Sequence, residues 1–235
     1  MPRTVLALIP LLFATSACVS LGRDTPPLEQ YVLGATPTAA AGAPPAGAAG
    51  MTVGLRRLDL TPYLASPSIV VRRGEHQILV SEYHRWGEDP VAGINRAFAG
   101  YLRAVPPVRS VDVAPWAVRS QHDFVVQLHV SRFEGVTPDD SLAVEGEAHL
   151  RARWELHRPR DGGLLARGGT DYRAGGWRVG DYPALVALLD GALSRMASDI
   201  AACMARVGPA SAPATAPATA RVPLECASDT GISAR

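Results

Sequence analysis

The feature that most constrains the fold is a run of alternating residues from Leu142 to His157. Apolar or small residues occupy every second position, and mainly Glu, Arg and His stand between them. An alternation with period two is typical of a β-strand that buries one face and leaves the other in water. The run therefore predicts a strand with Leu142, Val144 and Trp154 on its buried face and the charged residues on its exposed face.

Other segments predict further strands around this one. Phe124 to Val130 repeats the alternation, and the turn-rich Glu134 to Ser141 that follows predicts an antiparallel pair. Gly74 and Glu75 predict a tight hairpin connection. The remaining strands are expected at Tyr31 to Leu33, Val53 to Leu60, Ile69 to Arg73, Gln77 to Tyr83, Val108 to Val113 and Leu164 to Arg173.

Two segments predict helices. Asp89 followed by Pro90 is typical of a helix start, because the acid can cap the first turn and proline suits the first helical position. A second helix is expected from Tyr182 to Val207, after Asp181. Because this helix is apolar over much of its circumference, it is either buried on several sides or docks onto another molecule.

Together these elements predict an α/β fold. We expect a single domain in which a mixed or largely antiparallel sheet of five or six strands is packed with two main helices. The flanking stretches rich in Ala, Pro and Gly cannot bury enough apolar surface to order themselves. The chain therefore divides into a signal peptide at 1–17, an N-terminal segment and loop at 18–50, the α/β domain at 51–207 and a disordered tail at 208–235.

The leader has the layout of a secretory signal peptide. Arg3 precedes the apolar run Val5 to Phe13, and small residues lead up to Cys18. The run is shorter than the roughly 20 residues needed to cross a bilayer. A cysteine directly after the cleavage site predicts lipid attachment at Cys18. The alternative is an ordinary cleaved signal peptide, because Thr15 stands where bacterial lipoprotein signals usually carry an aliphatic residue.

Composition and motifs argue against several kinds of function. A net charge of +1 lacks the basic excess of a nucleic-acid-binding protein. We found no motif for a nucleophile, a metal or a phosphate group, and expect no catalytic residue, metal or cofactor. Asp139 and Asp140 lie in a predicted turn, where acids usually accept local backbone hydrogen bonds. Cys203 and Cys226 could form a disulfide in an oxidising compartment or stay unpaired.

The order of these segments resembles the ABC-type transport auxiliary lipoprotein family. Four pieces carry the resemblance: the leader with Cys18 and the following Tyr31 to Leu33, the segment Gly54 to Leu64 with Ser68 to Arg72 behind it, Arg85 to Pro90 at a helix start, and the later sheet with its C-terminal helix. The chain departs from the family pattern at Thr15, in the long loop Ala35 to Gly50 and in the tail after Val207.

The resemblance implies a non-enzymatic lipoprotein at the periplasmic face of the outer membrane, anchored through Cys18, with Val19 in keeping with outer-membrane sorting. Its partner would be an MCE-domain protein that bridges the two membranes in an ABC-linked lipid transport system. The chain could also form a homo-oligomer. Two other functions stay open: a lipid-binding carrier with an apolar pocket under the C-terminal helix, and a secreted enzyme with an unrecognised site.

The resemblance also points to candidate partner-binding residues at one edge of the sheet. These are Tyr63, Leu64, Tyr83, Arg85 and Trp86. Aromatic and arginine side chains are enriched in protein interfaces, which favours a partner surface. The alternative is that Tyr63 and Trp86 fill the space between the sheet edge and a helix, and that Arg85 pairs with a nearby acid or helix end.

Overall fold

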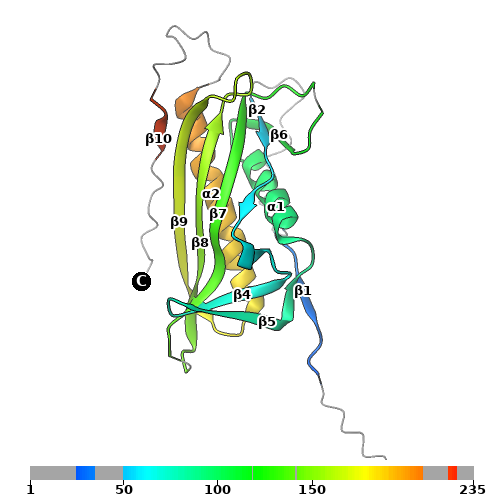
Figure 1. Cartoon of the computed structure of the whole chain (residues 1–235), viewed down its shortest axis with the longest axis vertical. Helices are drawn as coiled ribbons and strands as arrows, with labels where there is room; N and C mark the ends of the chain where they lie inside the picture. The colour runs from blue at the N-terminus through cyan, green and yellow to red at the C-terminus, as the bar shows by residue number, and fades with distance from the viewer. Residues whose placement is uncertain (1–24, 35–49, 118, 141, 209–221, 227–235) are drawn as a thin grey trace, which may run out of the picture.

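Three long antiparallel strands form the centre of the sheet (Figure 1). They are β7 (Phe124–Thr137), β8 (Glu145–His157) and β9 (Leu164–Arg178). The computed structural model describes residues 25–34, 50–117, 119–140, 142–208 and 222–226. The predicted pairing of the first two strands is confirmed. On β8, the small and apolar residues from Ala148 to Leu156 are buried at every second position, as the alternation predicts.

Two expectations for this pair are wrong. Leu142 and Val144 are 83% and 72% exposed, because β7 continues to Thr137 and the chain turns before β8 begins at Glu145. The apolar alternation therefore extends past the end of the strand. His149 lies on the face that was expected to be exposed, yet it is buried.

The sheet is mixed and contains all ten strands of the described residues. Its main order is β1-β5-β4-β7-β8-β9-β10; β2 lies between β6 and β7, and β3 pairs with β7. The other strands are β1 (Glu29–Tyr31), β2 (Met51–Leu55), β3 (Asp59–Leu60), β4 (Ser68–Arg73), β5 (Gln77–Trp86), β6 (Val108–Val113) and β10 (Leu224–Cys226). The α/β class is confirmed, but there are more strands than the five or six predicted.

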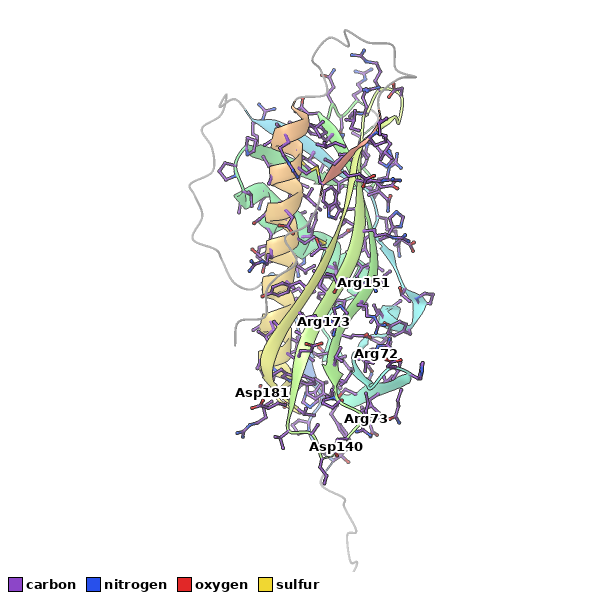
Figure 2. The ribbon with its side chains drawn as sticks, turned by 90° about the vertical axis from the view of Figure 1, so that its left-hand side faces the viewer. Arg72, Arg73, Asp140, Arg151, Arg173 and Asp181 are labelled. Carbon is purple, nitrogen blue, oxygen red and sulfur yellow. A yellow bond between two sulfur atoms is a disulfide. The ribbon has the colours of Figure 1, made fainter. Side chains whose placement is uncertain are left out.

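Both predicted helices are present and both begin at the predicted cap. In α1 (Pro90–Ala104) the side chain of Asp89 accepts a hydrogen bond from Ala92 N, and in α2 (Tyr182–Val207) Asp181 accepts one from Ala184 N. Figure 2 shows α2 along one face of the long strands. Its core-facing side chains are fully buried: Leu185, Leu189, Leu193, Met196 and Ile200. The apolar surface of α2 is thus largely used in packing the domain.

The two ends of the chain can be compared with the predicted division into signal peptide, N-terminal segment, domain and tail. The span expected to be a disordered tail, 208–235, contains the short strand β10, which pairs in parallel with β9. The predicted lipidation site, Cys18, lies outside the described residues. Within the described residues, no helix is both long enough and apolar enough to span a membrane.

Candidate functional site

The five candidate partner-binding residues lie on two neighbouring elements. Tyr63 and Leu64 belong to the short 3-10 helix η1 (Pro62–Ala65), and Tyr83, Arg85 and Trp86 belong to β5. Leu64 and Trp86 are buried in the core, where the Trp86 ring lies 5.8 Å from the ring of Phe133. These two side chains pack the domain. Partner contact stays a prediction for Tyr63, Tyr83 and Arg85, which are partly exposed.

An irregularity in β5 sets the position of Tyr83. The β4 residues Ser68 and Val70 pair with Arg85 and Val80, so β5 has more residues than β4 between the same two pairs. Such bulges bend a strand and redirect its side chains, often near functional surfaces. Arg85 has a buried Nε with no hydrogen-bond partner among the described residues. The edge therefore carries one aromatic and one incompletely paired cation.

Tyr63 belongs to a cluster around a buried carboxylate, on the face of the sheet that lies opposite α2. Glu134 on β7 is fully buried, and its Oε1 accepts hydrogen bonds from Arg72 Nε at 2.7 Å and from Arg132 Nη1 at 2.9 Å. Arg72 Nη2 also donates to the Tyr63 hydroxyl at 3.0 Å. Two guanidinium groups thus share one carboxylate, which leaves this cluster with a net positive charge.

The pKa values of this cluster reflect its burial and its pairing. Burial by itself would lower the pKa of Arg72, but hydrogen bonds to Glu134 and Tyr63 raise it above the ordinary value. The pKa of Tyr63 is raised by burial and by the nearby Glu134 carboxylate. Arg72 is therefore a permanent cation and Tyr63 a neutral hydroxyl, so the cluster suits positioning and binding rather than proton transfer.

Ion pairs continue from this cluster across β8 and β9. His149 Nε2 lies 2.7 Å from Asp171 Oδ1, and Arg151 Nε lies 3.4 Å from Asp171 Oδ2. Arg173 is hydrogen-bonded to Glu147. Figure 2 shows Arg72, Arg151 and Arg173 along this side of the strands. Burial lowers the pKa of His149, and the hydrogen bond to Asp171 opposes this shift. At neutral pH the His149 ring is therefore uncharged.

A shallow groove of about 910 Å³ lies at the other end of these strands. Its lining includes His129, Arg153, Arg167 and Gly169. Gly169 faces Arg153 across the β8–β9 pair and provides no side chain for it to contact. Arg153 has no hydrogen bond or ion pair to any residue of the described ranges. Among the described residues, the groove thus presents a cation without an ion-pair partner, a feature suited to binding an acidic group on a partner.

A second buried carboxylate attaches the N-terminal segment to the domain. Asp190 on α2 accepts a hydrogen bond from Gly34 N at 2.8 Å through Oδ1, and another from the Tyr101 hydroxyl of α1 at 2.5 Å through Oδ2. Burial, together with this bond to Asp190, raises the pKa of Tyr101. Arg96 Nη2 donates to the carbonyl oxygen of Leu33 at 2.9 Å. We call Leu33, Gly34, Arg96, Tyr101 and Asp190 the N-terminal clamp.

β1 extends this attachment towards the start of the chain. It pairs in parallel with β5, with Glu29 opposite His84 and Tyr31 opposite Trp86. Gly87 N donates to Tyr31 O at 2.8 Å, next to the end of that pairing. The segment that follows Cys18 is therefore bound to the sheet and to both helices through Glu29 to Gly34, the eleventh to sixteenth residues after the cysteine.

Sequence reasoning missed both buried carboxylates. Asp190 is an acid within the apolar N-terminal half of α2, a signal that could have marked it as a buried polar contact. Glu134 stands in a segment that was expected to be a turn, so nothing in the sequence pattern placed it inside a strand. Each carboxylate has a partner far away in sequence, 62 residues for Arg72 and 156 for Gly34.

The residue types gathered here are suited to binding and positioning. No group of three or more His, Cys, Asp or Glu side chains in the described parts of the chain could hold a metal ion. Asp140 Oδ1 accepts a hydrogen bond from Leu142 N at 2.8 Å, which gives this acid a local role in the turn. In the structure, Cys203 on α2 and Cys226 on β10 form a disulfide.

Comparison with known proteins agrees with this architecture. No curated protein matches the sequence. A crystal structure of protein XCC0632 from Xanthomonas campestris is similar, with a TM-score of 0.58 and 14% identity over 77% of this chain and 94% of that one. An uncharacterised protein has a TM-score of 0.54 and 16% identity over 75% of this chain and 98% of that one. The PelC dodecamer from Paraburkholderia phytofirmans gives 0.38, with 20% identity over 66% and 91%.

The assignment to a protein family comes from the sequence match. At their low identities, the two solved structures with TM-scores of 0.58 and 0.54 show a common fold only. The family model described as the ABC-type transport auxiliary lipoprotein component matches residues 31–201, which begin within β1 and end within α2. This match covers most of the chain and includes the N-terminal clamp, α1, most of α2 and all three long strands. The chain belongs to the family of ABC-type transport auxiliary lipoprotein components.

Proposed function

We propose that the chain is a non-enzymatic envelope lipoprotein that acts as the outer-membrane accessory of an MCE-type, ABC-linked lipid transport system. An acyl anchor on Cys18 holds the protein at the periplasmic face of the outer membrane. The α/β domain then binds an MCE-domain protein that spans the periplasm. No nucleotide site is needed on this chain, because the ATPase is another subunit of such a system.

The N-terminal clamp is the observation that carries this proposal. A lipid anchor limits where a domain can lie only if the chain between them is short and fixed at the domain. Here the first described strand starts eleven residues after Cys18, and Asp190 and Arg96 bind the chain just beyond it. The clamp thus provides a fixed attachment point for a lipid tether, as a membrane-bound accessory requires.

The charged side of the sheet supports a binding role for the domain. Partly exposed Tyr63, Tyr83 and Arg85 lie at one edge. Arg153, which has no ion-pair partner in the part of the chain that the structure describes, lies in a groove near the other. Tyr and Arg are common anchors of protein interfaces, and cations near a groove favour an acidic partner surface. The MCE-domain protein would contact this side, and a homo-oligomer of this chain would present several copies of it.

The alternative of a lipid-binding carrier is less well supported. It requires an apolar pocket under α2. The α2 side chains that face the sheet, such as Leu189, Met196 and Ile200, are fully buried in the core cluster. A lipid chain would have to displace these packed side chains, which costs stability in a close-packed interior.

Cell fractionation tests the anchor in this proposal. The full-length chain and a Cys18→Ser variant are expressed at equal levels in the native envelope and separated into membrane and soluble periplasmic fractions. The wild type is expected in the membrane fraction and the variant in the soluble one. A Cys226→Ser variant, which keeps Cys18, is the control and should stay with the membrane. Membrane retention of Cys18→Ser would contradict an acyl anchor at this position.

A further inference from the structure

Three aliphatic side chains are exposed together at one end of the domain. Leu142 and Val144, in the turn between β7 and β8, are 83% and 72% exposed, and Val179, in the turn between β9 and α2, is 39% exposed. The backbone joins the two turns, because Val179 N donates to Val144 O at 3.0 Å. We call these residues the aliphatic turn cluster. Exposed apolar groups that gather in this way usually mark a contact surface.

The start of the described chain lies at the same end of the molecule. Glu29 Oε2 is 3.5 Å from His84 Nδ1, and the His84 ring stacks on Tyr182 with 3.9 Å between the centroids. Tyr182 opens α2 only three residues after Val179. Figure 2 likewise shows Asp140, in the turn between β7 and β8, and Asp181, just before α2, near one end. Leu28, which precedes Glu29, is itself 51% exposed.

The length of the tether limits how the domain can meet a membrane. Ten residue steps separate Cys18 from Leu28, so a fully extended chain reaches about 36 Å. The helix α2 has 26 residues and is therefore about 39 Å long. If the end of the domain at the C-terminus of α2 touched the membrane, the chain from Cys18 to Leu28 would have to be almost fully extended along the length of α2. A short tether therefore favours an arrangement in which the end near Leu28, or a flank, faces the lipid.

We propose that the aliphatic turn cluster contacts the lipid surface in which Cys18 is anchored, so that the domain stands with this end on the membrane. This inference rests on the proposed lipid anchor at Cys18. Apolar side chains on short turns can enter the headgroup region, and together with an acyl chain they add to membrane attachment. The opposite end, with β10 and the turn between β8 and β9, then points away from the membrane.

Charges around the cluster favour a zwitterionic lipid surface. Figure 2 shows Arg73, Asp140 and Asp181 at this end, and in the chain Asp139 precedes Asp140 and Arg178 precedes Val179, so the two arginines are offset by three acids. Because the two signs are mixed, no net attraction to anionic headgroups is expected. The apolar side chains therefore account for the contact, and its strength should depend little on the salt concentration.

A fluorophore at Leu142 tests the contact, with a matched control at Val222. Val222 is 89% exposed and lies just before β10. β10 pairs with Ala166 to Gly168 on β9. Ala166 lies twelve residues before Arg178, which ends β9 next to the aliphatic turn cluster, so the two ends of β9 are about 40 Å apart. In the lipidated full-length protein, Leu142→Cys or Val222→Cys would supply a free thiol for a nitrobenzoxadiazole label. The protein is placed in phosphatidylethanolamine and phosphatidylcholine vesicles that contain a nitroxide-labelled lipid.

The emission maximum of the label at 142 is expected to shift to shorter wavelengths when vesicles are present. The nitroxide lipid should quench this label several-fold more than the label at 222. Flotation of the vesicles is measured on the same samples. If the protein floats with the vesicles but both labels respond equally, the proposed membrane contact of the aliphatic turn cluster is wrong, while the proposed lipid anchor at Cys18 is still supported. If the protein does not float, the anchor itself is wrong and the contact falls with it. A blue shift at 142 that appears without vesicles and grows with protein concentration would assign the cluster to a second copy and overturn the proposal.

Discussion

Tyr101 on α1 donates a hydrogen bond of 2.5 Å to Asp190 on α2, and the other oxygen of the same carboxylate accepts Gly34 N at 2.8 Å. One buried acid thus connects the two helices with the segment that leads towards Cys18. A buried carboxylate is costly unless its oxygens are paired, and here both are. The attachment of the N-terminal segment is therefore coupled to the packing of α1 against α2.

Replacing Asp190 with Ala should destabilise the domain and release the N-terminal segment. The change leaves the Tyr101 hydroxyl and Gly34 N without their acceptor, and we expect a loss of about 2–4 kcal/mol in the free energy of unfolding. Tyr101→Phe removes only one of the two bonds and should cost about 1–2 kcal/mol. Urea unfolding measures both, and hydrogen exchange at residues 31–34 reports the release. Unchanged exchange in Asp190→Ala would contradict the clamp.

Breaking the Glu134 cluster should lower the free energy of unfolding by more than breaking an exposed ion pair. Glu134→Ala leaves Arg72 and Arg132 without their shared carboxylate, and loss of one partner of a buried pair typically costs about 3–5 kcal/mol. Glu225→Ala is the matched control, since Glu225 and Arg167 pair at 2.5 Å with both side chains more than half exposed. That change should cost less than about 1 kcal/mol. Equal losses in urea unfolding would show that the Glu134 cluster adds no stability beyond an ordinary surface pair.

His149 should make the folded state sensitive to mild acid. Burial lowers its pKa in the folded protein, and the nearby Arg173 charge acts in the same direction, against the bond to Asp171. In the unfolded chain, histidine takes up a proton near its ordinary pKa of about 6.5. As the pH falls through that value, the unfolded state binds more protons than the folded state, so the free energy of unfolding decreases.

His149→Gln should weaken this dependence. We expect the stability of the wild type to fall more steeply than that of the variant between about pH 7.5 and about pH 5 in urea titrations. His76→Gln is the control, because the His76 side chain is 96% exposed and should leave the slope unchanged. Parallel slopes for the wild type and His149→Gln would argue against a neutral, buried His149.

The link between Cys203 and Cys226 should hold β10 on the edge of β9. Reduction frees a segment whose two cysteines are 23 residues apart in sequence, and the unfolded-state entropy of such a loop corresponds to about 3 kcal/mol. We expect reduction, or Cys226→Ser, to lower the melting temperature and to increase hydrogen exchange at Ala166 to Gly168, the partners of β10. Quantitative thiol labelling of the non-reduced, unfolded protein tests the pairing itself: both thiols should be unreactive, and labelling of either would contradict the disulfide.

The elements that could be predicted from the sequence are those with a long local pattern. The alternation in β8 and the capped, periodic helices α1 and α2 depend on neighbouring residues, and their positions were found closely. β10 has three residues, too few to show a period, and it exists only because β9 offers an edge. The run Val53 to Leu60 was expected as one strand, and the structure divides it into β2 and the two-residue β3, which pairs with β7. Leu142 and Val144 were misplaced for the opposite reason, since the pattern continues where the backbone turns.

The candidate site was harder to predict because distant pairs create it. Leu64 and Trp86 follow the family pattern, but in the fold they serve the core. Glu134 and Asp190 become important only through Arg72 and Gly34, which approach them from other elements. A single sequence does not contain these pairings, although an acid inside an apolar helix, as at Asp190, is a usable warning.

The most direct test of the proposed function is the recovery of a partner from native envelope. The full-length chain, with its anchor intact and at its native level, is crosslinked in intact cells, solubilised in detergent and purified, and the crosslinked proteins are identified by mass spectrometry. The account predicts an MCE-domain protein crosslinked to the wild type and strongly reduced with Cys18→Ser. Recovery of the chain alone, or of the same partners in equal amounts with Cys18→Ser, would contradict it.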